Sequence, residues 1–227
     1  YLCVLLSGCA SANAEQRFEA LGGSCTYSKV GNYVWHNEFY PHELDLTSGC
    51  AFVGISNIPL NAGSMHIGWR VGLANMGTAT SNAVFPMLDA EQPSHPSGAN
   101  CNPATWSGCI GRGVGEQKAL GISGGGVAEW DTKIGTFGTE IGLFLYEGSW
   151  KVTITPEAAS SGFHPVTLHW DGYQISPFLG VTYRYGYLMA MARYYGQIRA
   201  AEHGCGGCSG LASGGAHQAL IGLSVPF

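Results

Sequence analysis

The segment SMHIGWRVGLAN, residues 64–75, alternates between apolar side chains and small or polar ones. Successive side chains of a β-strand point to opposite faces, so this period of two predicts a strand. One face carries His66, Arg70 and small residues, whereas the other is purely apolar. The apolar positions are Met65, Ile67, Trp69, Val71 and Leu73. The apolar face needs a cover, which is a second sheet in a soluble protein or lipid around a membrane barrel.

The same alternation recurs along the chain, and no segment of comparable length has the helical period of 3.6. We therefore predict an all-β fold, an antiparallel transmembrane β-barrel. The expected strands lie near 17–28, 43–57, 63–76, 117–129, 133–146, 149–156, 172–185, 187–200 and 216–227. Bacterial outer-membrane barrels have an even number of strands. Joining 149–156 to 172–185 across an excursion at 157–171 gives eight strands, and ten is the alternative.

The composition favours the barrel over a secreted, disulfide-bonded β-sandwich, which is the alternative fold. Only 11% of the residues are charged, against about 25% in ordinary soluble domains, and 35 are glycine. The 10 lysines and arginines form no basic cluster, so no nucleic-acid partner is expected. The chain contains no internal apolar run of about eighteen residues, so no transmembrane helix is expected.

The predicted connections differ in length between the two ends of the strands. The short ones are 58–62, 129–132 and 185–187. The long ones are 29–42, 77–116, 157–171 and 201–215. Outer-membrane barrels combine short periplasmic turns with long extracellular loops, so the long segments are expected outside the cell. Binding is expected in the segment from Pro86 to Cys109.

Residues 1–14, YLCVLLSGCASANA, have the apolar run and small residues that end a secretory signal peptide. Cleavage after Ala14 gives a mature barrel domain at 15–227. The alternative is a lipoprotein signal at Leu6-Ser7-Gly8-Cys9, in which Cys9 is the lipidated residue.

The mature chain contains an even number of cysteines, as expected for disulfides in an oxidising compartment. Spacing suggests three local pairs. These are Cys25–Cys50, Cys101–Cys109 and Cys205–Cys208. A hairpin in which paired residue numbers sum to 75 places Cys25 opposite Cys50. A zinc site at Cys205 and Cys208 with His203 and His217 is the rival interpretation, but a second CxxC is missing, so no metal is expected.

The chain ends HQALIGLSVPF, in which Ala219, Ile221, Leu223, Val225 and Phe227 share one face. This alternation resembles the C-terminal signature of Gram-negative outer-membrane proteins, which the barrel assembly machinery recognises. The whole mature chain resembles small barrels of the OmpA-transmembrane and OmpW type. The resemblance implies an outer-membrane location, contact with membrane lipid and lipopolysaccharide, and a place for Phe227 in the periplasmic aromatic girdle.

Two further stretches, PHELDLTSGCAFVGISN and WRVGLANMGTATSNA, resemble uncharacterised exported barrel-like proteins of proteobacteria and their phages. This resemblance implies no activity and leaves a phage- or prophage-encoded origin open.

The polar face of the predicted strands places charged side chains inside the barrel. These residues are His66, Arg70, Glu140, Lys151 and Arg184. The interior of an eight-stranded barrel is just wide enough for side chains, and buried charges must pair. We therefore expect a structural network of ion pairs, and a porin-like polar path for small solutes is the alternative.

The densest group of titratable residues outside the expected strands is His164, His169 and Asp171. An enzyme acting at the lipid interface needs an oriented nucleophile or base, and these residues do not match the His-x-Ser arrangement of lipid A deacylases. We expect a structural or surface-interaction role, with passage of small apolar solutes as a further option and no cofactor. The alternatives are an enzyme that modifies lipid A or phospholipid, and a secreted β-sandwich binding module.

Overall fold

A computed structural model describes residues 15–27, 42–45, 47–86, 110–156, 164–196, 198 and 215–227. Over these ranges the regular structure consists of strands alone. No helix in the described ranges is long and apolar enough to cross a membrane.

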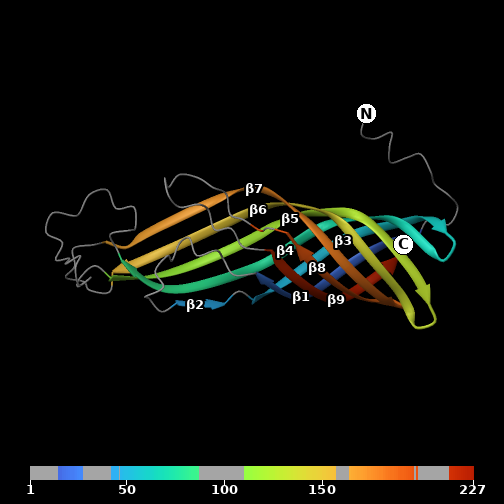
Figure 1. Ribbon diagram of the computed structural model, residues 1–227, viewed down its shortest axis with the longest axis horizontal. Coiled ribbons are helices and arrows are strands. Elements are labelled where there is room, and N and C mark those ends of the chain that lie inside the picture. Colours follow the sequence, from blue (N-terminus) through green and yellow to red (C-terminus); the bar gives the residue numbers. More distant parts are fainter. Residues whose placement is uncertain are drawn as a thin grey trace, which may run out of the picture.

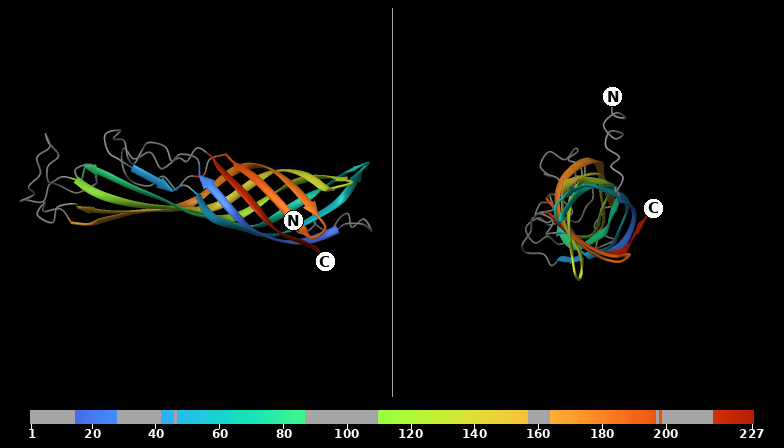
Figure 2. Two further views of the ribbon diagram at one scale, coloured as in Figure 1. Left: turned by 90° about the horizontal axis from the view of Figure 1, so that it is seen from below. Right: turned by 90° about the vertical axis from the view of Figure 1, so that its right-hand side faces the viewer.

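The strands form one antiparallel sheet that closes on itself (Figure 1). They are β1 (Glu15–Tyr27), β2 (His42–Asp45), β3 (Thr47–Ala62), β4 (Met65–Pro86), β5 (Ile110–Thr132), β6 (Gly135–Pro156), β7 (Val166–Tyr185), β8 (Leu188–Tyr195) and β9 (Ala216–Pro226). Eight of them make a ring in the order β3-β1-β9-β8-β7-β6-β5-β4, which the β3–β4 pair closes (Figure 2). The ninth, β2, adds to β4 outside this ring. The predicted all-β antiparallel barrel of eight strands is confirmed. The alternative fold, a β-sandwich of two separate sheets, does not describe this closed ring.

Tight turns gather at one end of the ring. Residues 63–64, 133–134 and 186–187 join β3 to β4, β5 to β6 and β7 to β8. Gly63 and Gly186 have positive φ angles of 68° and 59°, a backbone conformation that favours glycine. The last residue lies at the same end, because the Phe227 amide donates to the Gln16 carbonyl at 3.1 Å. The predicted 58–62 and 129–132 turns were placed a few residues too early.

The strands differ greatly in length. β4 to β7 have 20 to 23 residues, whereas β8 has 8 and β9 has 11. As a result β3 pairs with β4 only as far as Asn75, and β8 pairs with β7 only as far as Phe178. Beyond the ring, β4 to β7 continue as a four-stranded sheet, seen at the left of Figure 1. We call this the protruding sheet; it comprises β4 77–86, β5 110–119, β6 147–156 and β7 166–172. The short strand β2 pairs with its β4 edge at residues 80–83.

The protruding sheet corrects two predictions. Much of the expected loop 77–116 is strand, because GTATSNAVFP and IGRGVG pair with each other although neither has a continuous apolar face. Segment 149–156 continues the strand that begins at Gly135, and it is not joined to 172–185. The residue types of Glu147-Gly148-Ser149 favour a turn. In the structure this segment is continuous strand, and β5 and β7 both pair with it without a register shift.

The outer and inner faces of the ring alternate as the sequence predicted. Ile141, Leu143 and Leu145 are 65%, 57% and 50% exposed, whereas Phe144 and Tyr146 between them are buried. The last strand behaves in the same way: its alternate apolar residues from Ala219 to Phe227 are exposed, and Gln218, Leu220 and Ser224 are buried.

Candidate functional site

Arg70 of β4 lies at the centre of a buried ionic network inside the barrel. Its Nε donates to Glu19 Oε2 and its Nη1 donates to Glu140 Oε2, both at 2.6 Å. Glu19 also accepts a hydrogen bond at 2.8 Å from the Ser56 hydroxyl. Strand parity explains this meeting, because each residue occupies an inward position on its own strand.

Arg193 of β8 extends the network across the barrel. Its Nε donates to Glu140 Oε1, and its Nη2 donates to Glu140 Oε2 at 3.2 Å. The guanidinium carbon also lies 4.6 Å and 4.7 Å from the ring centroids of Phe52 and Phe178. An Arg side chain that is paired and flanked by aromatic faces is well compensated for its loss of water.

A third group lies nearer the tight turns. Arg17 Nη1 donates to Glu129 Oε2 at 2.8 Å, and Arg184 Nη2 lies 3.7 Å from the same oxygen. The second Glu129 oxygen, Oε1, lies 3.8 Å from Arg70 Nη2. The network therefore draws on β1, β4, β5, β6, β7 and β8, and it fills the interior with paired charges.

The predicted interior residues have different outcomes. Arg70 and Glu140 lie at the centre of the network and Arg184 at its edge. His66 is partly exposed at the tight-turn end, where its Nε2 lies 3.1 Å from Asp131 Oδ2. Lys151 was expected inside but is exposed, because β6 continues through it and odd-numbered residues of β6 face outward.

Asp131 itself occupies the β5–β6 hairpin. The Thr136 hydroxyl donates to its Oδ1 at 2.6 Å. This hydrogen bond, with smaller contributions from His66 and Arg184, lowers the pKa of the Asp131 carboxyl.

Four members of the network were not predicted from the sequence, namely Arg17, Glu19, Glu129 and Arg193. The alternation of inward and outward side chains along β1 could have identified Glu19. It lies between Phe18 and Ala20, and Phe18 is 47% exposed on the opposite face, so Glu19 points inward. A charged residue at an inward position of a predicted strand is a candidate for an ion pair with an inward charge on another strand. This holds even where the outward residues of the strand are only partly apolar.

An aromatic layer fills the interior on the side away from the tight turns. Phe144 stacks on Tyr146 at 4.8 Å and contacts Tyr195 at 5.3 Å, measured between ring centroids. A disulfide joins the buried Cys25 and Cys50 in the same cluster, with a Cα–Cα distance of 5.7 Å. Cys25 pairs with Ser48, so the disulfide is diagonal and the predicted β1–β3 register was wrong by two residues.

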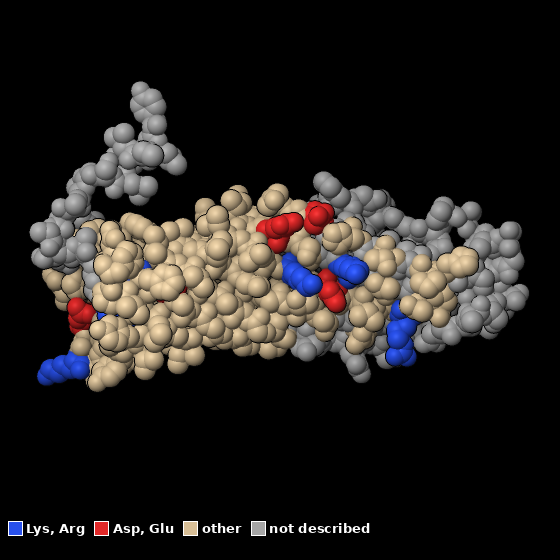
Figure 3. Space-filling model, turned by 180° about the vertical axis from the view of Figure 1, so that it is seen from behind, with Lys and Arg blue, Asp and Glu red and all other residues tan. Residues whose placement is uncertain are grey.

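The charged side chains that the structure describes fall into three groups. Those inside the barrel are Arg17, Glu19, Arg70, Glu129, Glu140, Arg184 and Arg193. Those at the tight turns are Asp131 and Lys133. Those on the protruding sheet are Arg112, Glu116, Lys118, Glu147, Lys151 and Asp171. None of the described charges lies on the outer wall between the two ends, and Figure 3 shows this uncharged band on one face.

The uncharged band has the height of a bilayer core. On β6 it covers residues 137–145, and on β5 it covers residues 120–130. A tilted transmembrane strand needs about 9–11 residues. Exposed aromatic side chains lie toward its two ends. Tyr185, Tyr187 and Phe227 lie at the tight-turn end, and Tyr173 and Tyr194 toward the other.

The catalytic candidates lie on or next to the protruding sheet. His164, His169 and Asp171 are exposed, and no hydrogen bond joins any two of them in the described part of the chain. His169 pairs in register with Lys151, and Lys118 Nζ lies 3.4 Å from Glu116 Oε2. The surface here is therefore a mixture of both charge signs.

Several predicted features lie outside the described residues. They are the signal segment 1–14 with Cys9, and Cys101, Cys109, Cys205 and Cys208 with His203. His217 is described and is exposed on β9. No cluster of three or more metal-ligating side chains occurs among the described residues.

No family model and no curated protein matches the sequence. Among solved structures, the chain is similar to Ail, the attachment invasion locus protein of Yersinia pestis, in complex with the heparin analogue sucrose octasulfate. The similarity has a TM-score of 0.43 at 10% sequence identity and covers 94% of this chain and 99% of that chain.

Proposed function

We propose that the chain is an outer-membrane β-barrel protein with a surface-interaction role. The observation that carries the proposal is the distribution of charge, which leaves the outer wall apolar over one bilayer thickness. A soluble monomer rarely exposes so large an apolar surface. A closed ring also satisfies its backbone hydrogen bonds internally, as a membrane requires.

The asymmetry of the two ends supports the orientation. The tight turns lie together at one end, the pattern of the periplasmic side in bacterial outer-membrane barrels. The protruding sheet then stands outside the cell. The last strand, ending at Phe227, is the segment that we propose the assembly machinery binds.

The protruding sheet is the part available to a partner. Residues 77–86 of β4, 110–119 of β5 and 147–156 of β6 each extend about 33 Å along the strand, and residues 166–172 of β7 extend less far. Among the described residues, no strand pairs with the outer edge of β7 from 166 to 176. An open edge of this kind is a template for an extended segment of a partner protein.

The interior supports a structural role better than transport. Paired charges and stacked aromatic rings occupy the barrel interior, and their side chains are buried. The passage of small solutes and a lipid-modifying activity therefore receive no support from the described side chains.

Fractionation and surface labelling test the proposal. We would express the chain behind a complete signal peptide and run the outer-membrane fraction on gels with and without boiling. We expect a heat-dependent mobility shift in that fraction, and a soluble chain without a shift would contradict the proposal. For orientation, a membrane-impermeant maleimide on whole cells should label Lys151→Cys but not Lys133→Cys, with the unsubstituted chain as background.

A further inference from the structure

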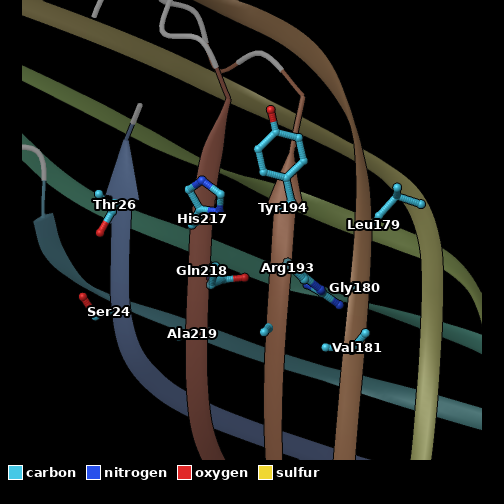
Figure 4. A pocket seen from close by; sticks show the side chains of 11 residues that line it. Ser24, Thr26, Leu179, Gly180, Val181, Arg193, Tyr194, His217, Gln218 and Ala219 are labelled. Carbon is cyan, nitrogen blue, oxygen red and sulfur yellow. The ribbon is translucent and has the colours of Figure 1, made fainter. Parts of the chain in front are cut away.

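The outer wall of the barrel has a hollow of ≈ 470 Å³ across β7, β8, β9 and β1 (Figure 4). Its floor is a row of small side chains. Ser24 pairs in register with Ala219, and Ala219 pairs with Ala192. Three adjacent strands therefore lack a large outward side chain at the same level.

Larger side chains surround this floor. On the side toward the long connections, Thr26, His217 and Tyr194 form the next outward row. The rings of Tyr194 and His217 contact each other, with centroids 5.0 Å apart. On β7, Leu179 and Val181 are 59% and 57% exposed and make the lateral wall. The hollow is thus a groove in the apolar outer wall, and larger side chains lie around it.

The groove has a polar end and an apolar end. Thr26 and His217 lie at the ends of β1 and β9 away from the tight turns, where the apolar band stops. Ala192 and Val181 lie further inside the band, nearer the β7–β8 turn. A membrane lipid has the same polarity, with a headgroup at the interface and an acyl chain below it.

We propose that this groove binds one acyl chain of an outer-leaflet lipid. Thr26, His217 and the Tyr194 hydroxyl supply hydrogen-bonding groups to its headgroup. The inference rests on the proposed membrane location. Lipid around a smooth barrel wall touches protein on one side, whereas a chain in this groove gains contacts with its floor and its walls.

Photo-cross-linking tests the groove. The full barrel is reconstituted in phosphatidylethanolamine and phosphatidylglycerol vesicles that contain a phosphatidylethanolamine with a diazirine on one acyl chain. Cross-links are then mapped by mass spectrometry. We expect at least threefold more lipid on 179–194 and 216–221 than on 137–145, the smooth outer wall of β6. Equal labelling of the two walls would overturn the inference.

Filling the groove provides the matched variant. Ala192→Phe should reduce cross-linking at the groove to the level of the β6 wall, and Leu143→Phe on β6 should leave it unchanged. Both substitutions point outward, and a heat-modifiability gel checks that each variant is a barrel. If groove labelling persists in Ala192→Phe, the groove is not the binding site.

The polar end is tested separately. His217→Ala combined with Tyr194→Phe should reduce the excess labelling at least twofold, and an unchanged excess would overturn the headgroup assignment. A barrel that enters vesicles but labels evenly refutes only the groove. A chain that stays soluble refutes the proposed membrane location itself.

Discussion

Strands β4 to β7 run through both the ring and the protruding sheet, and their side chains follow different patterns in the two regions. Within the ring, β6 alternates between exposed Ile141 or Leu143 and buried Glu140 or Phe144. Beyond the ring, the same strand places Glu147 and Lys151 on its outer face. The change occurs without a register shift. An alternating apolar pattern therefore shows which part of a strand has an apolar outer face. It does not show where the strand begins or ends.

The largest expected difference between the ring and the protruding sheet is in the free energy of unfolding that is lost when a carboxylate is removed. Glu140→Gln removes the carboxylate that pairs with Arg193 and one of the carboxylates that pair with Arg70. Removal of one member of a buried ion pair costs about 3–5 kcal/mol. Glu147→Gln on the protruding sheet should cost no more than about 1 kcal/mol. Urea unfolding in lipid vesicles measures both free energies. Equal losses would mean that the interior network contributes no more than a surface charge.

An added charge should separate the regions next. Leu143→Arg places a cation on the outer wall of the ring, where the cost near the bilayer midplane is about 2–4 kcal/mol. Val114→Arg changes a residue that is 45% exposed on the protruding sheet and should cost about 0–1 kcal/mol. The same unfolding measurement applies. A costly Val114→Arg would place the membrane boundary farther along β5.

A surface pair on the protruding sheet should matter little. The exposed Lys118 and Glu116 lie 3.4 Å apart, and exposed pairs contribute about 0–1 kcal/mol. Lys118→Ala should leave the unfolding free energy almost unchanged at moderate salt. A loss similar to that of Glu140→Gln would show that this region is shielded from water.

The smallest effect is a pH dependence at the tight turns. The pKa of Asp131 is lowered in the folded state, so its contribution to stability is present above its unfolded pKa of about 3.9 and is lost as pH falls through the folded value. Between pH 7 and pH 3, the unsubstituted protein should lose up to about 1 kcal/mol more than Asp131→Asn. Parallel pH profiles for the two proteins would remove Asp131 from this role.

The sequence predicted what depends on local pattern. The apolar faces at Met65–Leu73 and from Ala219 to Phe227 were found by alternation alone, and so was the inward parity of Arg70 and Glu140. Partners were not found, because Glu19 and Arg70 meet only through the β1–β3 and β3–β4 registers. The register between β1 and β3 also determines the geometry of the disulfide. Cys25 pairs with Ser48 across the two strands, so its bond to Cys50 is diagonal.

The pairing of Arg17 with Pro226 has a consequence for the order of folding. β1 cannot gain its second neighbour until β9 has been synthesised, so ring closure must follow the synthesis of all the other strands of the ring. Until then any partial sheet has two unpaired edges and an uncovered apolar face, both of which favour aggregation. Contacts so distant in sequence also form slowly. The first strand of this ring is therefore the one whose edge stays exposed to wrong partners the longest.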